Sequence, residues 1–269
     1  MKVIPNHAKQ RLLEGELALG MGLRQARTVD ISQIAKSCDF DWLFIDMEHN
    51  SMSIDTAAQI CQAALGMGIT PMIRVPAHEA FHSTRLLDTG AQGIVVPHVS
   101  NAEQARAVVS FCRFTPLGHR SIPGSLPQTR FMSLPVPETV SLINSETLVV
   151  AMIETVEGCE NVDEIAAVPG IDALLVGCTD MAAELGVPGQ LGHSSVKASL
   201  DRVFAACTRH GKICGVGGVY DEVLMEEYVH KGARLILSGS DLAFLMAGAR
   251  SRSTRLRSIQ LAKQERAVI

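Results

Sequence analysis

Three ionisable side chains directly follow one apolar segment near the start of the chain. Residues Trp42 to Ile45 are apolar enough to form a buried strand, and Asp46, Glu48 and His49 follow within four positions. In parallel α/β barrels, catalytic side chains lie where the strands end. A neighbouring carboxylate can also orient an imidazole and tune it for acid–base work. We therefore take His49 as the candidate acid–base catalyst, with Asp46 and Glu48 supporting it or the local network.

Further charged side chains adjoin other candidate strands. Arg74 lies in an apolar strand, where a fixed guanidinium could stabilise a developing enolate oxygen; a structural salt bridge is the alternative. Asp88 precedes the next strand and is either the partner of His49 or a turn cap. Glu154 and Asp180 end two later apolar runs, and two carboxylates with open coordination positions suit Mg²⁺, Mn²⁺ or Co²⁺. For Asp180, a charge at a helix start is the alternative.

The residues before Asp180 form a predicted strand-to-helix turn, Gly177, Cys178 and Thr179. Backbone N–H groups and a helix N-terminus at such a turn attract anions, so we expect a substrate carboxylate to bind there. The cysteines do not have the spacing of a zinc site. No lysine follows these strands to form a Schiff base, which favours metal-dependent over imine chemistry.

Eight short, mostly continuous apolar segments are expected to position these residues as strands buried on both faces. They are residues 17–23, 42–46, 71–75, 93–97, 148–154, 173–177, 212–216 and 234–237. Helical patterns follow at 53–65, 101–112, 156–168, 195–209, 221–230 and 241–262, with Asn101 as an expected helix cap. Alternating units of this kind predict a (β/α)8 TIM barrel, with an open doubly wound sheet as the alternative.

The segment 113–146 interrupts this alternation. It is rich in proline and glycine, and it separates the fourth predicted strand from the fifth. A long irregular connection in a compact domain is usually a lid or an interaction surface, and a disordered insertion is the alternative.

Composition narrows the class of protein. The chain has 269 residues, of which 47% are apolar, and no linker is evident, so we expect a single domain over 1–269. The net charge of −4, without a clustered basic face, argues against nucleic acid as a partner. No apolar run is long enough to span a membrane and no signal peptide is evident. The seven cysteines lack paired motifs, which favours a reduced, cytoplasmic protein.

Several blocks together resemble the HpcH/HpaI aldolase family. They are residues 40–49, 73–76, 87–93, 96–105, 153–155, 170–180 and 185–186, in family order, and the resemblance covers about residues 15 to 245. It implies a barrel of the phosphoenolpyruvate/pyruvate-domain type. It also implies metal-dependent aldol chemistry on a 2-oxo acid and an aldehyde.

The resemblance also assigns roles to single residues. It implies that Glu154 and Asp180 are the metal ligands, that Arg74 binds a substrate oxygen, and that His49 works with Asp88 as the acid–base pair. It implies a hexamer, or trimer of dimers, in which the C-terminal helix (241–262) packs on a neighbouring subunit. Two positions depart from the family pattern. Met152 replaces a frequent glutamine, and Gly177-Cys-Thr-Asp replaces Gly-Pro-Ala-Asp.

We therefore predict a divalent-metal-dependent aldolase that cleaves or forms 4-hydroxy-2-oxo acids. One alternative is an acyl-CoA lyase of the citrate-lyase-like barrels. Another is a catalytically silent barrel that binds a carboxylate, which the Met152 substitution keeps open. A third is a metal-free isomerase of phosphorylated sugars, with the glycine-containing turns at 215–218 and 238–240 as its phosphate loops.

Overall fold

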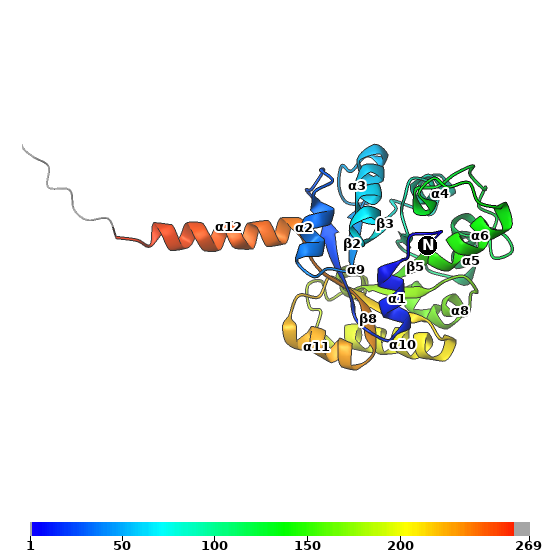
Figure 1. The fold of residues 1–269 in the computed structure, drawn as a ribbon. Helices are drawn as coiled ribbons and strands as arrows, with labels where there is room; N and C mark the ends of the chain where they lie inside the picture. Colours follow the sequence, from blue (N-terminus) through cyan, green and yellow to red (C-terminus); the bar gives the residue numbers. More distant parts are fainter. Residues whose placement is uncertain (1, 261–269) are drawn as a thin grey trace, which may run out of the picture.

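The chain folds into a closed barrel of eight parallel strands, each hydrogen-bonded to its sequence neighbours, with β8 closing on β1. The computed structural model describes residues 2–260, and Figure 1 shows the barrel with helices packed around it. The strands are β1 (Ala18–Leu23), β2 (Trp42–Asp46), β3 (Thr70–Arg74), β4 (Gly93–Val96), β5 (Leu148–Ile153), β6 (Ala173–Gly177), β7 (Ile213–Gly217) and β8 (Ala233–Ser240). The predicted (β/α)8 barrel is confirmed.

Helices connect the strands and surround the sheet. They are α1 (His7–Leu13), α2 (Ile31–Ser37), α3 (Ile54–Met67), α4 (Ala80–Asp88), α5 (Ala102–Cys112), α6 (Val136–Glu146), α7 (Val156–Glu160), α8 (Val162–Ala166), α9 (Cys178–Glu184), α10 (Ser194–His210), α11 (Glu222–His230) and α12 (Asp241–Arg257). A 3₁₀ turn, η1, spans Pro127–Thr129. Asn101 caps α5 as expected, because its side chain accepts a hydrogen bond from the N–H of Gln104.

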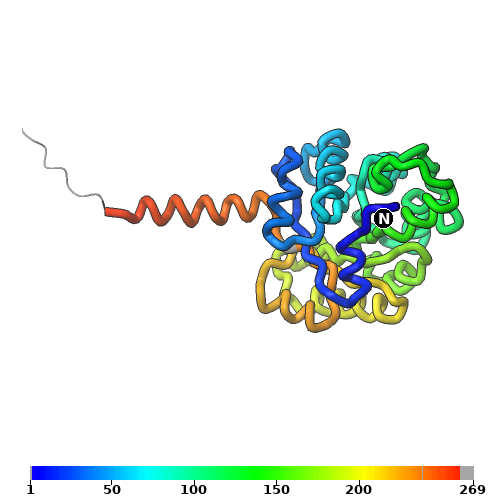
Figure 2. Tube along the Cα trace, in the orientation of Figure 1, coloured from blue at the N-terminus to red at the C-terminus, as the bar shows by residue number. Residues whose placement is uncertain are grey.

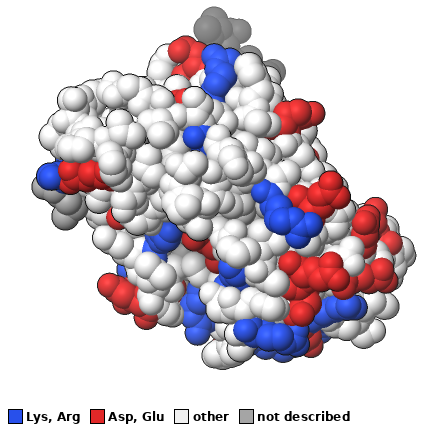
Figure 3. All heavy atoms as spheres, turned by 90° about the vertical axis from the view of Figure 1, so that its right-hand side faces the viewer, with Lys and Arg blue, Asp and Glu red and all other residues white. Residues whose placement is uncertain are grey.

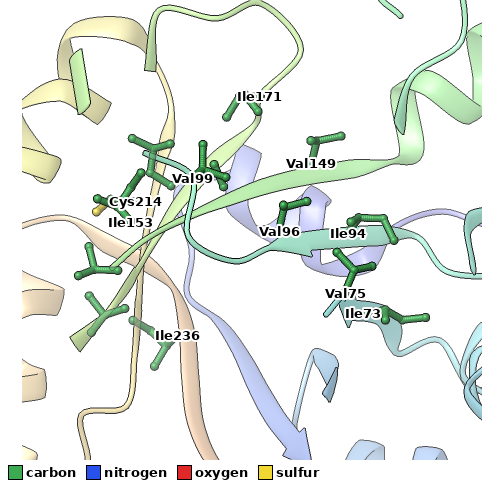
Figure 4. Packing of buried hydrophobic residues seen from close by; sticks show 14 of the residues in the cluster. Ile73, Val75, Ile94, Val96, Val99, Val149, Ile153, Ile171, Cys214 and Ile236 are labelled. Carbon is green, nitrogen blue, oxygen red and sulfur yellow. The ribbon is translucent and has the colours of Figure 1, made fainter. Parts of the chain in front are cut away.

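Two apolar layers explain why the strands read as continuously hydrophobic. Successive strand side chains alternate between the barrel interior and the helices. The outward layer includes Ile73, Ile94 and Val149, which lie together in Figure 4. The inward layer forms a second cluster with Trp42 and Met72. Burial on both faces therefore holds the strand ends in fixed positions around the mouth of the barrel.

Close packing inside the barrel requires a glycine at one position of β1. A Cβ atom on Gly20 would lie 2.2 Å from the Trp42 ring. The indole N–H of Trp42 donates to the carbonyl of Ala18 at 3.1 Å, which satisfies its only polar group. The fully buried tryptophan therefore packs beside β1 without an unpaired donor.

The structure corrects two predicted elements. The helix expected over 156–168 is divided at Asn161 into α7 and α8. The segment 113–146 is not irregular throughout, because it contains η1 and the eleven-residue helix α6. Its prolines misled the prediction: Pro135 and Pro137 lie at the start of α6, where proline is compatible with a helix.

The last described helix projects away from the barrel. Figures 1 and 2 show α12 extending to one side, and none of its residues is buried. The helix was expected over 241–262, whereas α12 ends at Arg257. Residues 261 and 262 lie outside the described residues. None of the helices within residues 2–260 combines the length and the apolar character that crossing a membrane would require.

Candidate active site

A pocket of about 430 Å³ opens where the strands end. Its polar lining comes from loops and strand ends that are far apart in sequence, and includes Arg24, Asp46, His49, Arg74, Glu154, Thr179, Asp180 and Tyr220. The carboxyl ends of parallel barrel strands meet at one face, which is where active sites of this fold lie. The structure thus brings seven of the eight predicted site residues into the lining of one pocket, all except Asp88.

Asp46 organises the turn that carries the opening cluster. Its Oδ1 accepts hydrogen bonds from the backbone N–H groups of Glu48 and His49, at 3.1 and 3.3 Å. Arg74 donates to both carboxylate oxygens, from Nε at 3.0 Å and from Nη2 at 2.7 Å. Burial alone would raise the pKa of Asp46, but the hydrogen bonds and charge of Arg74 outweigh it and lower the pKa. Asp46 is therefore an ionised structural support.

Arg74 is engaged by a second carboxylate. Its Nη1 lies 2.9 Å from Oε2 of Glu48, and the guanidinium stacks on the Phe44 ring at 5.1 Å. The buried salt bridge considered for Arg74 is thus present, yet Arg74 also lines the pocket. A guanidinium carries five N–H donors, so the contacts with Asp46 and Glu48 leave donors for a ligand.

His49 is the accessible member of this cluster. Its side chain is 52% exposed, and Nε2 lies 3.6 Å from Oε2 of Glu48. Glu48 is largely covered, with 11% of its side chain exposed. The ring can therefore reach a ligand in the pocket while the carboxylate stays behind it.

Glu154, at the end of β5, has an unusual environment in the same pocket. Its Oε1 accepts the backbone N–H of His98 at 2.8 Å. Its Oε2 is buried and has no hydrogen-bond partner among the described residues. Burial raises the pKa of Glu154, and the nearby Asp180 carboxylate raises it further against the opposing effect of His98. An unpaired, buried carboxylate oxygen is costly unless a cation or a donor satisfies it.

Gly177 allows Glu154 to occupy this place. A Cβ atom on Gly177 would lie 2.3 Å from Oε2 of Glu154. Strand β6 therefore passes directly beside the carboxylate, and α9 begins at the next residue. Asp180 lies in the first turn of α9, so it is also the helix-start charge that was considered as an alternative to a metal ligand.

The turn predicted to bind a carboxylate also lines the pocket. Thr179 is exposed and Cys178 is buried. Burial raises the pKa of the Cys178 thiol to about 12, so a thiolate at this position is disfavoured. Any role of Cys178 in binding would use its backbone, and anion binding at this turn stays a prediction.

Met152 contributes an apolar surface to the pocket. It is 4% exposed and lines the cavity with Phe44 and Leu175. The side chain of Met152 packs close to the Gly177 backbone. A Cβ atom added to Gly177 would lie 3.2 Å from Cε of Met152. The position where the family often has glutamine is thus part of an apolar floor.

Asp88 lies away from this pocket within one chain. It is the last residue of α4, which runs back from the mouth and ends before β4 begins. Its Oδ1 accepts a hydrogen bond from Nη2 of the buried Arg120 at 2.6 Å. The structure supplies no contact between Asp88 and His49, and their pairing stays a prediction.

Sequence reasoning missed three residues at the mouth. Arg24 follows β1 directly and lines the pocket, as does Tyr220 in the loop after β7. His98 follows β4 with a left-handed backbone (φ 52°), and its ring lies 3.5 Å from Glu48 and 3.4 Å from Glu154. The signal that found Arg74 and Glu154, a polar residue at a strand end, applies equally to Arg24 and His98.

The carboxylates fit a divalent cation. Glu154 offers an unpartnered oxygen, and Asp180 is close enough to raise its pKa. No three His, Cys, Asp or Glu side chains within residues 2–260 come together as a metal-binding group. The protein would then supply two oxygen ligands and leave positions for water and substrate, which suits Mg²⁺ or Mn²⁺.

Fold and site together define a parallel (β/α)8 barrel with a carboxylate-lined pocket at its mouth. Residues 24–247 match the family model described as HpcH/HpaI aldolase/citrate lyase. The chain belongs to this family, as its sequence blocks predicted.

Similar proteins cover nearly the whole chain. It is 38% identical to a 4-hydroxy-4-methyl-2-oxoglutarate aldolase from Hapsidospora irregularis over 97% of this chain and 98% of that protein. It is 34% identical to a 4-hydroxy-2-oxovalerate aldolase from Novosphingobium aromaticivorans, over 93% and 94% of the two chains. A crystal structure of an HpcH/HpaI aldolase from Desulfitobacterium hafniense superposes with a TM-score of 0.89 at 30% identity, covering 94% of this chain and 97% of that one.

Proposed function

We propose that this protein is a divalent-metal-dependent aldolase that cleaves 4-hydroxy-2-oxo acids into pyruvate, or a related 2-oxo acid, and a carbonyl compound. The buried, unpartnered Oε2 of Glu154 carries the proposal, because it stands beside Asp180 in a pocket that also holds Arg74 and His49. Family membership and the aldolase relatives support the same reaction.

Glu154 and Asp180 would hold the cation. When bound, Mg²⁺, Mn²⁺ or Co²⁺ would act as a Lewis acid towards the 2-oxo group. The turn at Gly177–Thr179 would place backbone N–H groups near the substrate carboxylate. Gly177 keeps space for the Glu154 carboxylate at this point.

His49 and Arg74 would act on the reacting atoms. In the cleavage direction, His49 removes the proton of the 4-hydroxyl group, directly or through a water molecule, and the C3–C4 bond breaks. The bond electrons pass into the enolate of the 2-oxo acid, while C4 becomes the carbonyl carbon of the second product. Arg74, fixed by Asp46 and Glu48, stabilises the negative oxygen that develops. The protonated His49 then returns a proton to C3, so the enzyme ends in its starting state.

We further propose that the protein is a cytoplasmic homo-oligomer, a hexamer or trimer of dimers. All seven cysteines are described and none is in a disulfide, which supports a reducing compartment. The helix α12 exposes a run of apolar residues, Leu242, Phe244, Leu245 and Met246. Figure 3 shows a broad area with few charges on the side that lies at the right of Figure 1. Such surfaces favour contact with other subunits.

Release of pyruvate from 4-hydroxy-2-oxo acids tests the proposed reaction. We expect the wild type, supplied with Mn²⁺, to cleave 4-hydroxy-4-methyl-2-oxoglutarate or 4-hydroxy-2-oxovalerate. Glu154→Gln should lose most of this activity, because an amide is a weaker ligand for a hard cation than a carboxylate. Glu157→Gln, three residues further along on an exposed position, is the matched control and should keep it. A wild type that cleaves neither acid, or a fully active Glu154→Gln, contradicts the proposal.

A further inference from the structure

Arg24 is a second arginine of the pocket to which the proposed reaction assigns no role. It follows β1 directly, and its backbone is held in place. Its N–H donates to Oδ1 of Asp241 at 2.8 Å. The next two N–H groups, of Gln25 and Ala26, donate to the other oxygen of Asp241 at 2.9 and 2.6 Å. The turn that carries Arg24 is thereby fixed to the start of α12.

The guanidinium of Arg24 is only partly engaged. Nη1 donates to Oδ2 of Asp46 at 3.2 Å, and Arg74 binds the same oxygen more closely, at 2.7 Å. Among the described residues, Nε and Nη2 of Arg24 have no hydrogen-bond partner, and 42% of the side chain is exposed. The side chain of Arg74 is 8% exposed and pairs with both Asp46 and Glu48. Arg24 therefore has free donors and a charge that the pocket carboxylates neutralise only in part.

The strand order places Arg24 across the mouth from the metal carboxylates. The eight strands form a closed barrel, and β1 is four strands away from β5 in either direction. The two strands therefore lie on opposite sides of the barrel. Glu154 follows β5 and Asp180 follows β6. A substrate whose 2-oxo acid end lies between Glu154 and Asp180 can extend its other end across the apolar floor, towards Arg24.

We propose that Arg24 binds a second carboxylate, carried by the substrate at the end remote from its 2-oxo group. This inference rests on the proposed function and narrows its substrate class to 4-hydroxy-2-oxo dicarboxylic acids. A guanidinium matches a carboxylate with two parallel N–H···O bonds, and such charge-assisted pairs are among the strongest hydrogen bonds. The electrophile formed by cleavage then carries its own carboxylate, as 4-hydroxy-4-methyl-2-oxoglutarate would require. Arg24 is in this account a specificity-determining residue, and Asp241 positions it.

Equilibrium binding of two unreactive acids tests the role of Arg24 without turnover. The probes are 2-oxoglutarate and 2-oxopentanoate, which have the same number of carbons and differ in a carboxylate or a methyl group at the far end. We expect calorimetry on the Mn²⁺-loaded wild type to show roughly 10- to 100-fold tighter binding of 2-oxoglutarate, the range typical for a hydrogen-bonded charge. Arg24→Met should abolish this preference.

Arg27→Met is the matched control from the same turn. Arg27 donates to the carbonyls of Arg24 and Ala26 and does not line the pocket, so its loss should leave the preference intact. If Arg24→Met and Arg27→Met lost the preference for 2-oxoglutarate equally, the preference would come from the overall positive charge of the turn. That result would overturn the proposal. Equal affinity of the wild type for the two acids would overturn it without any variant, as would a preference that survives in Arg24→Met.

Turnover separates this inference from the proposed reaction. In a functional aldolase, Arg24→Met should lower kcat/KM for 4-hydroxy-4-methyl-2-oxoglutarate, relative to that for 4-hydroxy-2-oxovalerate, by a similar roughly 10- to 100-fold factor. If the wild type cleaves neither acid but shows the binding preference, the reaction is wrong and the carboxylate site stands. If it cleaves both acids and the ratio is the same in Arg24→Met, the reaction stands and the role of Arg24 is wrong.

Discussion

Gly177→Ala should damage the proposed metal site through one added methyl group. The new Cβ would lie 2.3 Å from Oε2 and 2.9 Å from Cβ of Glu154, both too close for real contacts. The carboxylate oxygen must move by about 1 Å to reach an ordinary contact of 3.4 Å. The backbone itself suits alanine, because φ at Gly177 is −83°. The substitution therefore acts on the neighbouring carboxylate and not through backbone strain.

The size of the effect follows from that displacement. A misplacement of about 1 Å in a catalytic site can cost about 100-fold, so we expect kcat/KM for pyruvate release to fall by about that factor. Overpacking in a close-fitting interior costs about 1–3 kcal/mol, so the protein should remain folded with a reduced free energy of unfolding. Calorimetric titration with Mn²⁺ should show weaker binding, and urea unfolding measures the stability cost.

Gly217→Ala is the matched control on the next strand. Gly217 is the register partner of Gly177, and a Cβ there would meet Leu237 at an ordinary 3.5 Å. It should therefore retain Mn²⁺ binding. A Gly177→Ala protein that binds Mn²⁺ and releases pyruvate like the wild type would refute the reasoning about Glu154.

The Asp46 cluster and His49 give three further predictions. Asp46→Asn should reduce the free energy of unfolding by about 3–5 kcal/mol in urea titrations, since it breaks a buried ion pair and leaves Arg74 undercompensated. Because Arg74 lowers the pKa of Asp46, the carboxylate stabilises the fold above the ordinary aspartate pKa of about 3.9 and loses this contribution as the pH falls through its lower folded value. Unfolding measured in that acidic range should show a smaller loss of stability in Asp46→Asn than in the wild type, and an identical loss would contradict the assignment. His49→Ala should lower kcat by about 10²- to 10⁴-fold. Its Tm should change little because the ring is 52% exposed, and an unchanged kcat would exclude acid–base work by His49.

The barrel could be predicted because its strands are buried on both faces. Continuous apolar runs mark such strands, and the runs at 42–46 and 173–177 coincide with β2 and β6. The helix α6 escaped prediction because prolines are loop signals in general, whereas Pro135 and Pro137 stand where a helix can begin.

The candidate site was only partly readable from the sequence. Strand-end polarity identified Arg74, Glu154 and Asp180, and closure of the barrel brings them to one pocket. Asp88 also adjoins a strand, but it precedes that strand and is the last residue of a helix. Its position away from the pocket therefore became clear only from the three-dimensional path of α4. The unpartnered oxygen of Glu154 depends on side-chain packing, which no sequence pattern reports.

Metal dependence of the aldol cleavage tests the central claim most directly. Pyruvate release from 4-hydroxy-4-methyl-2-oxoglutarate would be measured on one preparation as purified, after dialysis against EDTA, and after Mn²⁺ is returned. We predict that EDTA abolishes the activity and that Mn²⁺ restores it, because Glu154 and Asp180 offer carboxylate oxygens and no lysine within residues 2–260 lines the pocket to support imine chemistry. Full activity in EDTA would contradict the account.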